Sequence, residues 1–263
     1  MGACDIQMKN KQMYGLPISL MLFQIILLLL ITLLIIFLLS ASKIVYLNVS
    51  IIFFLILISY IFIYKNSRKF IRDRKRVLDL MIQSAKLSGD ENILDIGTGA
   101  GYIAIGFAKK LQNGVVHGID KYGQKNTDII TSIIESIKIN FFGNTLENAK
   151  NNAILEKQEN KIYFVAADLT KSFPFASQTF DVIVSSQFLY CIHHDKLEMV
   201  LSEINRVLKI NGKIIFFESN QFMNWDMKNI IKFFKSKQYE INILNIDVFQ
   251  NKSILVGTKK INT

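Results

Sequence analysis

The sequence predicts an α/β protein, a doubly wound and mostly parallel sheet with antiparallel C-terminal edge strands, preceded by two transmembrane helices. Three observations predict it. Two long uncharged apolar runs stand near the N-terminus, and strand and helix patterns alternate from Val77 onward. The last two strand patterns have no helix pattern between them. Alternation favours a parallel sheet with helices on both faces, and directly consecutive strands favour antiparallel pairing at an edge.

The two apolar runs are long enough to cross a bilayer as a helical hairpin. Ile18 to Leu39 holds 22 uncharged residues and Ile44 to Tyr64 holds 21, with four residues between them. At about 1.5 Å per residue, each run spans the hydrocarbon core of roughly 30 Å. The alternative is a pair of buried core helices. Residues 1–64 are therefore expected to form an N-terminal segment and a transmembrane hairpin, with helices at about 18–39 and 44–64.

The charge of the chain is concentrated next to this hairpin. The formal net charge is +10, whereas Val77 to Thr263 has 21 Lys and Arg against 19 Asp and Glu, which leaves +8 in the first 76 residues. Most of that charge lies in 65–76, a basic juxtamembrane linker that acts as a topology determinant or also binds anionic lipid. Positive charge stays cytoplasmic, so we expect a two-pass integral membrane protein. Its N-terminus and the domain at 77–263 are then both cytoplasmic.

The cysteines and histidines exclude some classes of protein. Cys4 and Cys191 match neither a disulfide framework nor a metal-binding spacing, and only three His are present, so no metal is expected. Gly2 and Cys4 permit an alternative with lipid modification of the N-terminus, but Ile6 stands where that pattern requires Ser or Thr.

The alternation in 77–263 predicts each element in turn from its period of hydrophobic residues. The expected helices are Val77–Leu87, Tyr102–Gln112, Asp128–Phe142, Thr145–Leu155, Lys196–Leu208 and Asn229–Ser236. The expected strands are Asn92–Ile96, Gly114–Ile119, Lys161–Ala166, Phe180–Ser185, Lys213–Glu218, Glu240–Phe249 and Ser253–Thr258.

A glycine-rich turn follows the first of these strands. The stretch Ile93-Leu-Asp-Ile-Gly-Thr-Gly-Ala-Gly101 ends a strand at Asp95 and opens a helix near Tyr102. Such a turn lies at the carboxyl edge of a doubly wound sheet, where ligands bind. The dinucleotide-binding spacing G-x-G-x-x-G fails because Tyr102 occupies its last position, which argues against an NAD-linked dehydrogenase. An acid at the strand end disfavours a nearby pyrophosphate and suits a ligand with an ammonium group.

The turn resembles motif I of class I S-adenosylmethionine-dependent methyltransferases, and the domain resembles their type 11-like, Rossmann-like members. Further pieces at matching spacing cover roughly Val77 to the C-terminus; they are Gly118–Asp120, Val165–Leu169, Phe180–Ser186 and Arg206–Lys213. The resemblance implies S-adenosyl-L-methionine as the cofactor.

The resemblance also implies the residues that bind the cofactor. Asp95 would hold its methionine end, Asp120 the ribose hydroxyls and Asp168 the adenine amino group. Each acid could instead be a turn or cap residue. The full set is Asp95, Gly97, Thr98, Gly99, Gly101, Asp120, Asp168, Leu169 and Ser185.

One segment departs from the family pattern. Residues 121–143 insert an extra amphipathic helix-like stretch between the second and third strands. It could be a lid, a membrane-surface contact or plain packing.

The expected activity is methyl transfer to a small or lipid-like acceptor near the membrane. A base is needed only if the acceptor arrives protonated. The candidates are Tyr190, His193 and His194, each of which could instead be a structural or surface residue. No Asn-Pro-Pro-Tyr-like segment follows the fourth strand and the domain is nearly neutral, so no nucleic-acid partner is expected. The alternatives are a non-catalytic membrane protein that retains the fold, and a membrane-tethered interaction module.

Overall fold

A computed structural model describes residues 28–29, 31–32, 35, 45–122, 144–222, 225–246 and 251–260. The chain divides into two compact units, Gly15–Arg76 and the unit that contains Val77–Thr263. Most of the first apolar run, the N-terminal Gly2 and Cys4, and residues 123–143 of the insertion lie outside the described residues.

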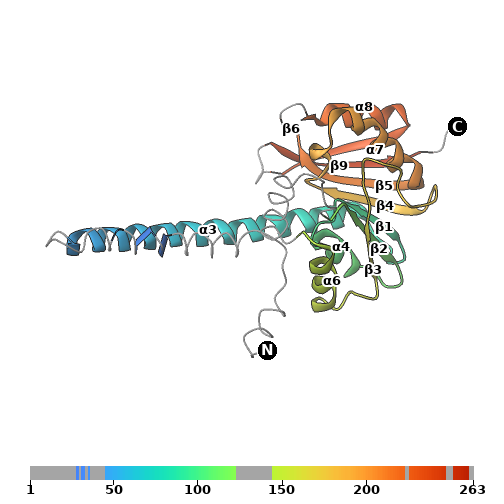
Figure 1. Cartoon of the computed structure of the whole chain (residues 1–263). Coiled ribbons are helices and arrows are strands. Elements are labelled where there is room, and N and C mark those ends of the chain that lie inside the picture. The colour runs from blue at the N-terminus through green and yellow to red at the C-terminus, as the bar shows by residue number, and fades with distance from the viewer. Residues whose placement is uncertain are drawn as a thin grey trace. The chain divides into compact units, whose positions relative to one another are not determined.

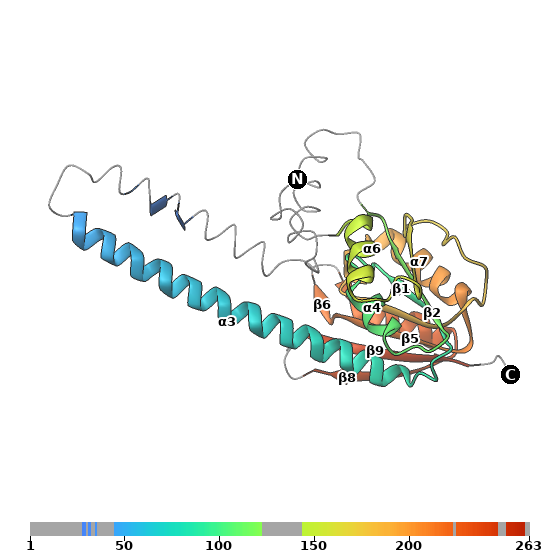
Figure 2. The same cartoon turned by 90° about the horizontal axis from the view of Figure 1, so that it is seen from below.

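The unit from Val77 is built on a seven-stranded sheet (Figure 1). Its strands are β1 (Asn92–Ile96), β2 (Val115–Asp120), β3 (Ile162–Ala166), β4 (Phe180–Ser186), β5 (Leu208–Ser219), β8 (Tyr239–Asn245) and β9 (Lys252–Lys259). The order is β3-β2-β1-β4-β5-β9-β8. The first five strands pair in parallel, whereas β9 pairs antiparallel with both β5 and β8. The doubly wound sheet with an antiparallel C-terminal edge is therefore confirmed, and β8 forms the edge opposite β3. Figure 2 shows β8 beside β9.

Helices cover both faces of this sheet because successive strand residues point to opposite sides. Leu94 and Phe216 belong to one buried cluster, with side chains of α7 (His194–Val207) and α8 (Met227–Ser236). Their neighbours Ile93 and Phe217 belong to a second cluster, with side chains of α4 (Tyr102–Ala108), α6 (Leu146–Leu155) and the last part of α3. A short helix η1 (Leu189–Cys191) follows β4, and β6 (Gln221–Phe222) pairs with β7 (Trp225–Asp226).

The longest helix differs from the expectation. The helix predicted to start at Val77 is the last part of α3, which runs without a break from Val45 to Ala85. The basic stretch 65–76 is therefore helical, because nothing in it breaks a helix. Among the residues that the structure describes, no helix is both long enough and apolar enough to cross a membrane.

Two boundaries were also predicted wrongly. The helix expected to reach Gln112 ends at Ala108, where short-range bonds such as Leu111 N to Ala108 O tighten the turn. The strand expected at Lys213 begins at Leu208, since the stretch expected to be a turn continues β5 through an irregularity opposite β4, with Asn211 at φ +62°.

Candidate functional site

The glycine-rich turn lies at the carboxyl edge of the sheet, between β1 and α4. Gly97, Gly99 and Gly101 have φ of +71°, +50° and +83°, a region that residues with a Cβ rarely adopt. The amides of Gly97 and Thr98 both donate to the carbonyl of Ile119, at 2.9 and 3.1 Å. The turn is thus fixed over the end of β2.

Three side chains from distant parts of the chain approach the glycines closely. A Cβ added to Gly97 would lie 2.2 Å from Phe188 Cγ, and one added to Gly101 would lie 2.8 Å from Phe164 Cζ. At Gly99 the nearest atom, 3.0 Å away, belongs to Asn144. The glycines are therefore needed for close packing as well as for their backbone angles.

Asp95 supports the turn from inside. Its side chain is buried, and Oδ2 accepts hydrogen bonds from Thr98 Oγ1 at 2.7 Å and from Ala104 N at 3.0 Å. Burial raises the pKa of Asp95 to about 7, and the charge of Asp120 adds to that effect. Asp95 thus connects β1 to the turn and to α4. Its contact with the methionine end of a cofactor stays a prediction.

Asp120 is the more accessible acid of the site. It ends β2, and Oδ2 accepts from Gly99 N at 2.9 Å while Oδ1 accepts from Tyr122 N at 3.3 Å. Each carboxylate oxygen can accept a further bond. The carboxylate therefore lies against the glycine turn with acceptor capacity left, as binding of ribose hydroxyls requires.

Tyr122 joins the site and was missed from the sequence. Burial, followed by the charges of Asp120 and Asp95, raises its pKa. Among the described residues, no atom forms a hydrogen bond with the buried Tyr122 hydroxyl. A buried hydroxyl without a partner is costly, so a polar ligand group at this place would be stabilised. Its φ of +45° is uncommon for a residue with a side chain and is visible only in the structure.

The next two predicted residues follow β3. Oδ1 of Asp168 accepts from Thr170 N at 3.0 Å and from Thr170 Oγ1 at 2.7 Å, and these bonds lower the pKa of Asp168. Its side chain therefore closes a local turn, the alternative role considered from the sequence. Leu169 is buried in the cluster beneath α7, so its side chain contributes to the core.

The last predicted binding residue, Ser185, leads to a buried acid that the sequence analysis did not select. Ser185 is buried in β4 and donates to Glu218 Oε1 at 3.2 Å. The same oxygen accepts from the amides of Phe188 and Leu189, both at 3.0 Å. Within the described residues, Glu218 Oε2 has no hydrogen-bond partner. Glu218 therefore holds the segment whose Phe188 side chain packs on Gly97. The signal in the sequence was an acid at the end of an apolar strand, as at Asp95.

The structure separates the three candidates for a base. Tyr190 lies in η1, next to Cys191, and burial raises its pKa to about 12, with a contribution from the charge of Glu218. His193 and His194 are exposed at the start of α7, where His193 pairs with Asp195. Tyr190 is thus the candidate nearest the buried acid.

Burial raises the pKa of Glu218 from 4.5 to about 7, so the folded state retains its proton where the unfolded state has lost it. The stabilisation from this proton is complete below the unfolded pKa and is lost as the pH rises through 7. We expect the free energy of unfolding of the parent to fall by about 2 kcal/mol more than that of Glu218→Gln between pH 5 and pH 8.

Urea unfolding of both proteins at each pH measures this difference. Asp95 and His117 are present in both proteins, so their contributions to the pH dependence cancel when the two proteins are compared. Parallel pH dependences would mean that Glu218 is ionised in the folded state.

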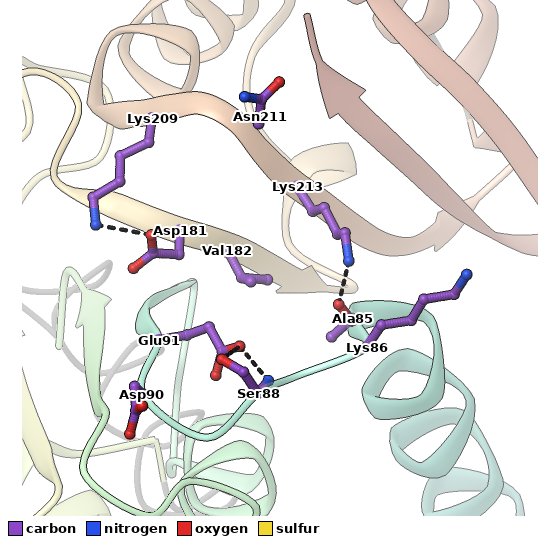
Figure 3. A pocket seen from close by; sticks show the side chains of 10 residues that line it. All are labelled: Ala85, Lys86, Ser88, Asp90, Glu91, Asp181, Val182, Lys209, Asn211 and Lys213. Atoms are coloured by element: carbon purple, nitrogen blue, oxygen red, sulfur yellow. Dashed lines mark hydrogen bonds and ion pairs between the residues drawn. The ribbon is translucent and has the colours of Figure 1, made fainter.

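A separate pocket lies away from the glycine turn. It has a volume of about 380 Å³, and its lining comes from the loop before β1 and the starts of β4 and β5, which form the amino edge of the sheet (Figure 3). Lys209 pairs with Asp181 at 2.8 Å, and Lys213 Nζ donates to the carbonyl of Ala85 at 2.6 Å. The pocket is lined by three basic and three acidic side chains, so it favours neither anionic nor cationic ligands. Over the described residues, no cluster of His, Cys, Asp and Glu could hold a metal ion.

Comparison with known proteins agrees with the geometry. Residues 122–216 match a family described as "Methyltransferase domain". This part of the chain, about a third of its length, is similar to methyltransferase domains. The matched range begins after the glycine turn and Asp120, so these residues support the resemblance independently of the match.

The curated relatives match this chain over part of their length. An uncharacterized protein of Methanocaldococcus jannaschii, MJ1252, is 37% identical over 89 residues, which are 34% of this chain and 33% of that protein. The uncharacterized methyltransferase YcgJ of Bacillus subtilis is 25% identical over 142 residues, 54% of this chain and 46% of the relative. The chain thus spans less than half the length of either relative.

Solved structures share the fold at low identity. An O-methyltransferase family protein of Burkholderia thailandensis has a TM-score of 0.55 at 10% identity, covering 78% of this chain and 60% of its own. The cyclase SpnF has a TM-score of 0.55 at 16% identity, covering 71% and 82%. Because a cyclase is among them, the fold alone does not fix the reaction.

Proposed function

We propose that the protein is a membrane-anchored methyltransferase that moves the methyl group of S-adenosylmethionine to a small or lipophilic acceptor. The observation that carries this proposal is the grouping of three features at one edge of the sheet. They are the glycine turn, the Asp120 carboxylate and the buried Tyr122 hydroxyl, which has no hydrogen-bond partner among the described residues. These groups are suited to a ligand with both hydroxyl and apolar parts.

The residues of the chain would bind and orient the reactants. The turn allows the cofactor to approach the backbone, and Asp120 accepts hydrogen bonds from the ribose hydroxyls. When bound, S-adenosylmethionine supplies a methyl group on a positively charged sulfur, which a nucleophile displaces in line. The chain contributes orientation and exclusion of water, which are the main protein contributions to such a transfer.

The segment after β4 is the proposed acceptor side. Phe188 packs on the turn, and Tyr190 follows it in a half-buried position. Apolar and aromatic groups there favour a small or lipophilic acceptor. The +2 charge of 77–263 gives no reason to expect a nucleic acid.

Membrane anchoring rests on the two apolar runs and on the surface of α3. Phe54, Ile58 and Phe62 are 60%, 61% and 68% exposed, at a spacing that puts them on one helix face. Large apolar side chains gathered on an exposed face indicate a lipid or protein contact. The basic residues that follow support the two-pass arrangement with a cytoplasmic domain.

Membranes that contain the full-length protein are incubated with S-adenosylmethionine labelled in its methyl group. We expect label in the organic-solvent extract, and the protein in the pellet after an alkaline carbonate wash. Label in protein or nucleic acid would contradict the acceptor class, and release by carbonate would contradict the anchor. Cofactor binding without transfer to any fraction would favour a non-catalytic protein or another reaction.

A further inference from the structure

Four basic residues form a stripe along α3, directly after its apolar part. Lys65, Arg68, Lys69 and Arg72 follow the spacing i, i+3, i+4, i+7, which places them on one face of a helix. All four are exposed. We call these four residues the basic stripe.

The charge of the stripe remains available at the surface. Arg68 Nη1 donates to the Tyr64 hydroxyl at 2.9 Å, a neutral partner, and its guanidinium lies 5.7 Å from the centre of the Tyr64 ring. Arg72 approaches Asp73 at 4.0 Å, but the Arg72 side chain is 76% exposed and that of Asp73 is 10% exposed. Asp73 is the lone acid in 65–76. Phe70 and Ile71, which lie off the stripe, are exposed and uncharged.

The position of the stripe along the helix favours a membrane surface as its partner. Lys65 lies about 4.5 Å along the axis from the exposed Phe62, and Arg72 about 15 Å from it. A helix that holds its apolar part in lipid therefore brings the stripe to the headgroup layer. The effect of positive charges on membrane topology depends on their number and not on the side of the helix on which they lie. The arrangement on one face is an additional feature that points to a ligand on that side.

We infer that the basic stripe binds the phosphates of anionic phospholipids on the cytoplasmic side of the membrane. This inference rests on the proposed membrane anchoring. Lys and Arg are attracted to anionic leaflets, and guanidinium groups match the geometry of phosphate. Contact on one face would fix the rotation of α3 about its axis relative to the membrane surface.

The test uses the full-length chain in vesicles of phosphatidylcholine, with or without phosphatidylglycerol. Trypsin cleaves after Lys and Arg, so its rate within 65–76, followed by mass spectrometry, reports on the stripe itself. Flotation of the vesicles reports separately on anchoring. In the matched control, Lys65→Asn with Asn66→Lys and Arg68→Ser with Ser67→Arg scatter the charges around the helix and leave composition and net charge unchanged.

We expect phosphatidylglycerol to slow cleavage of the parent about tenfold, since basic side chains that are held at an anionic surface are shielded from the protease. High salt should reverse this slowing. The control variant should float equally well but show little slowing. Equal slowing in both proteins would overturn the inference, because the face would not matter.

Anchoring and stripe binding can fail separately. If the protein floats with pure phosphatidylcholine vesicles but phosphatidylglycerol does not slow tryptic cleavage, lipid binding by the basic stripe is contradicted and membrane anchoring is retained. If the protein instead floats, and resists trypsin, only with vesicles that contain phosphatidylglycerol, that result would support lipid binding by the basic stripe and contradict the proposed membrane anchoring. Protection by duplex DNA or RNA in place of vesicles would overturn the inference in favour of a nucleic acid.

Discussion

Gly97→Ala is expected to lower the free energy of unfolding by about 4 kcal/mol. Two effects add: a φ of +71° is strained for a residue with a Cβ, and the new methyl group would lie 2.2 Å from Phe188 Cγ. Glu218 holds the backbone of Phe188 through its amide, so that side chain cannot withdraw freely. Urea unfolding of the full-length protein in detergent measures the change.

Two controls separate strain from overlap. Gly89→Ala also strains the backbone, with φ of +112°, but its nearest neighbour is the flexible Gln112 side chain at 3.3 Å, so we expect no loss from steric overlap there. In a Phe188→Ala background, Gly97→Ala should cost about 1–3 kcal/mol, which is the backbone part alone. An equal cost in both backgrounds would contradict the packing of Phe188 on Gly97.

Asp120→Ala is expected to weaken S-adenosylmethionine binding about 100-fold. The substitution removes a charged acceptor for the ribose hydroxyls and also releases Gly99 N, to which Asp120 Oδ2 is bonded at 2.9 Å. Hydrogen bonds to a charged group contribute about 1.5–3 kcal/mol each, so two bonds at the lower end of that range, about 3 kcal/mol together, account for the expected loss. Calorimetric titration of the solubilised full-length protein measures the dissociation constant.

Asp181→Ala is the matched control for this prediction. Asp181 also accepts a backbone amide, that of Asn92 at 2.9 Å, but it stands at the amino edge of the sheet. Its replacement should leave cofactor affinity within a few fold. A cofactor analogue that lacks a ribose hydroxyl should lose less affinity on Asp120→Ala than S-adenosylmethionine does. Equal losses would mean that Asp120 acts only through the glycine turn.

Much of the sheet could be predicted because its signals are local. β1 was placed correctly from Asn92 to Ile96, and the start of β9 within one residue, since alternation of strand and helix patterns sets the element types. The glycine turn and Asp120 were found for the same reason, as each ends a strand that the pattern identifies. Boundaries that depend on a register irregularity, such as the start of β5, were not predictable.

The residues that complete the site could not be found in this way. Glu218 and Ser185 are 33 positions apart in the chain, and their contact exists only because β5 lies beside β4. Tyr122 is notable only because its hydroxyl is buried without a partner among the described residues. Neither property has a period or a spacing that a sequence displays.

The sequence by itself determined the α/β class, the strand that ends in the glycine turn, the acid that follows β2 and the concentration of charge in 65–76. These are properties of neighbouring residues, and backbone geometry converts them directly into structure. The tertiary structure alone decided that Phe188 covers Gly97, that Glu218 holds the segment after β4, and that Asp95 supports the turn from within the core. Side chains far apart in the chain meet only after the sheet has formed, so their contacts depend on packing and not on any local pattern.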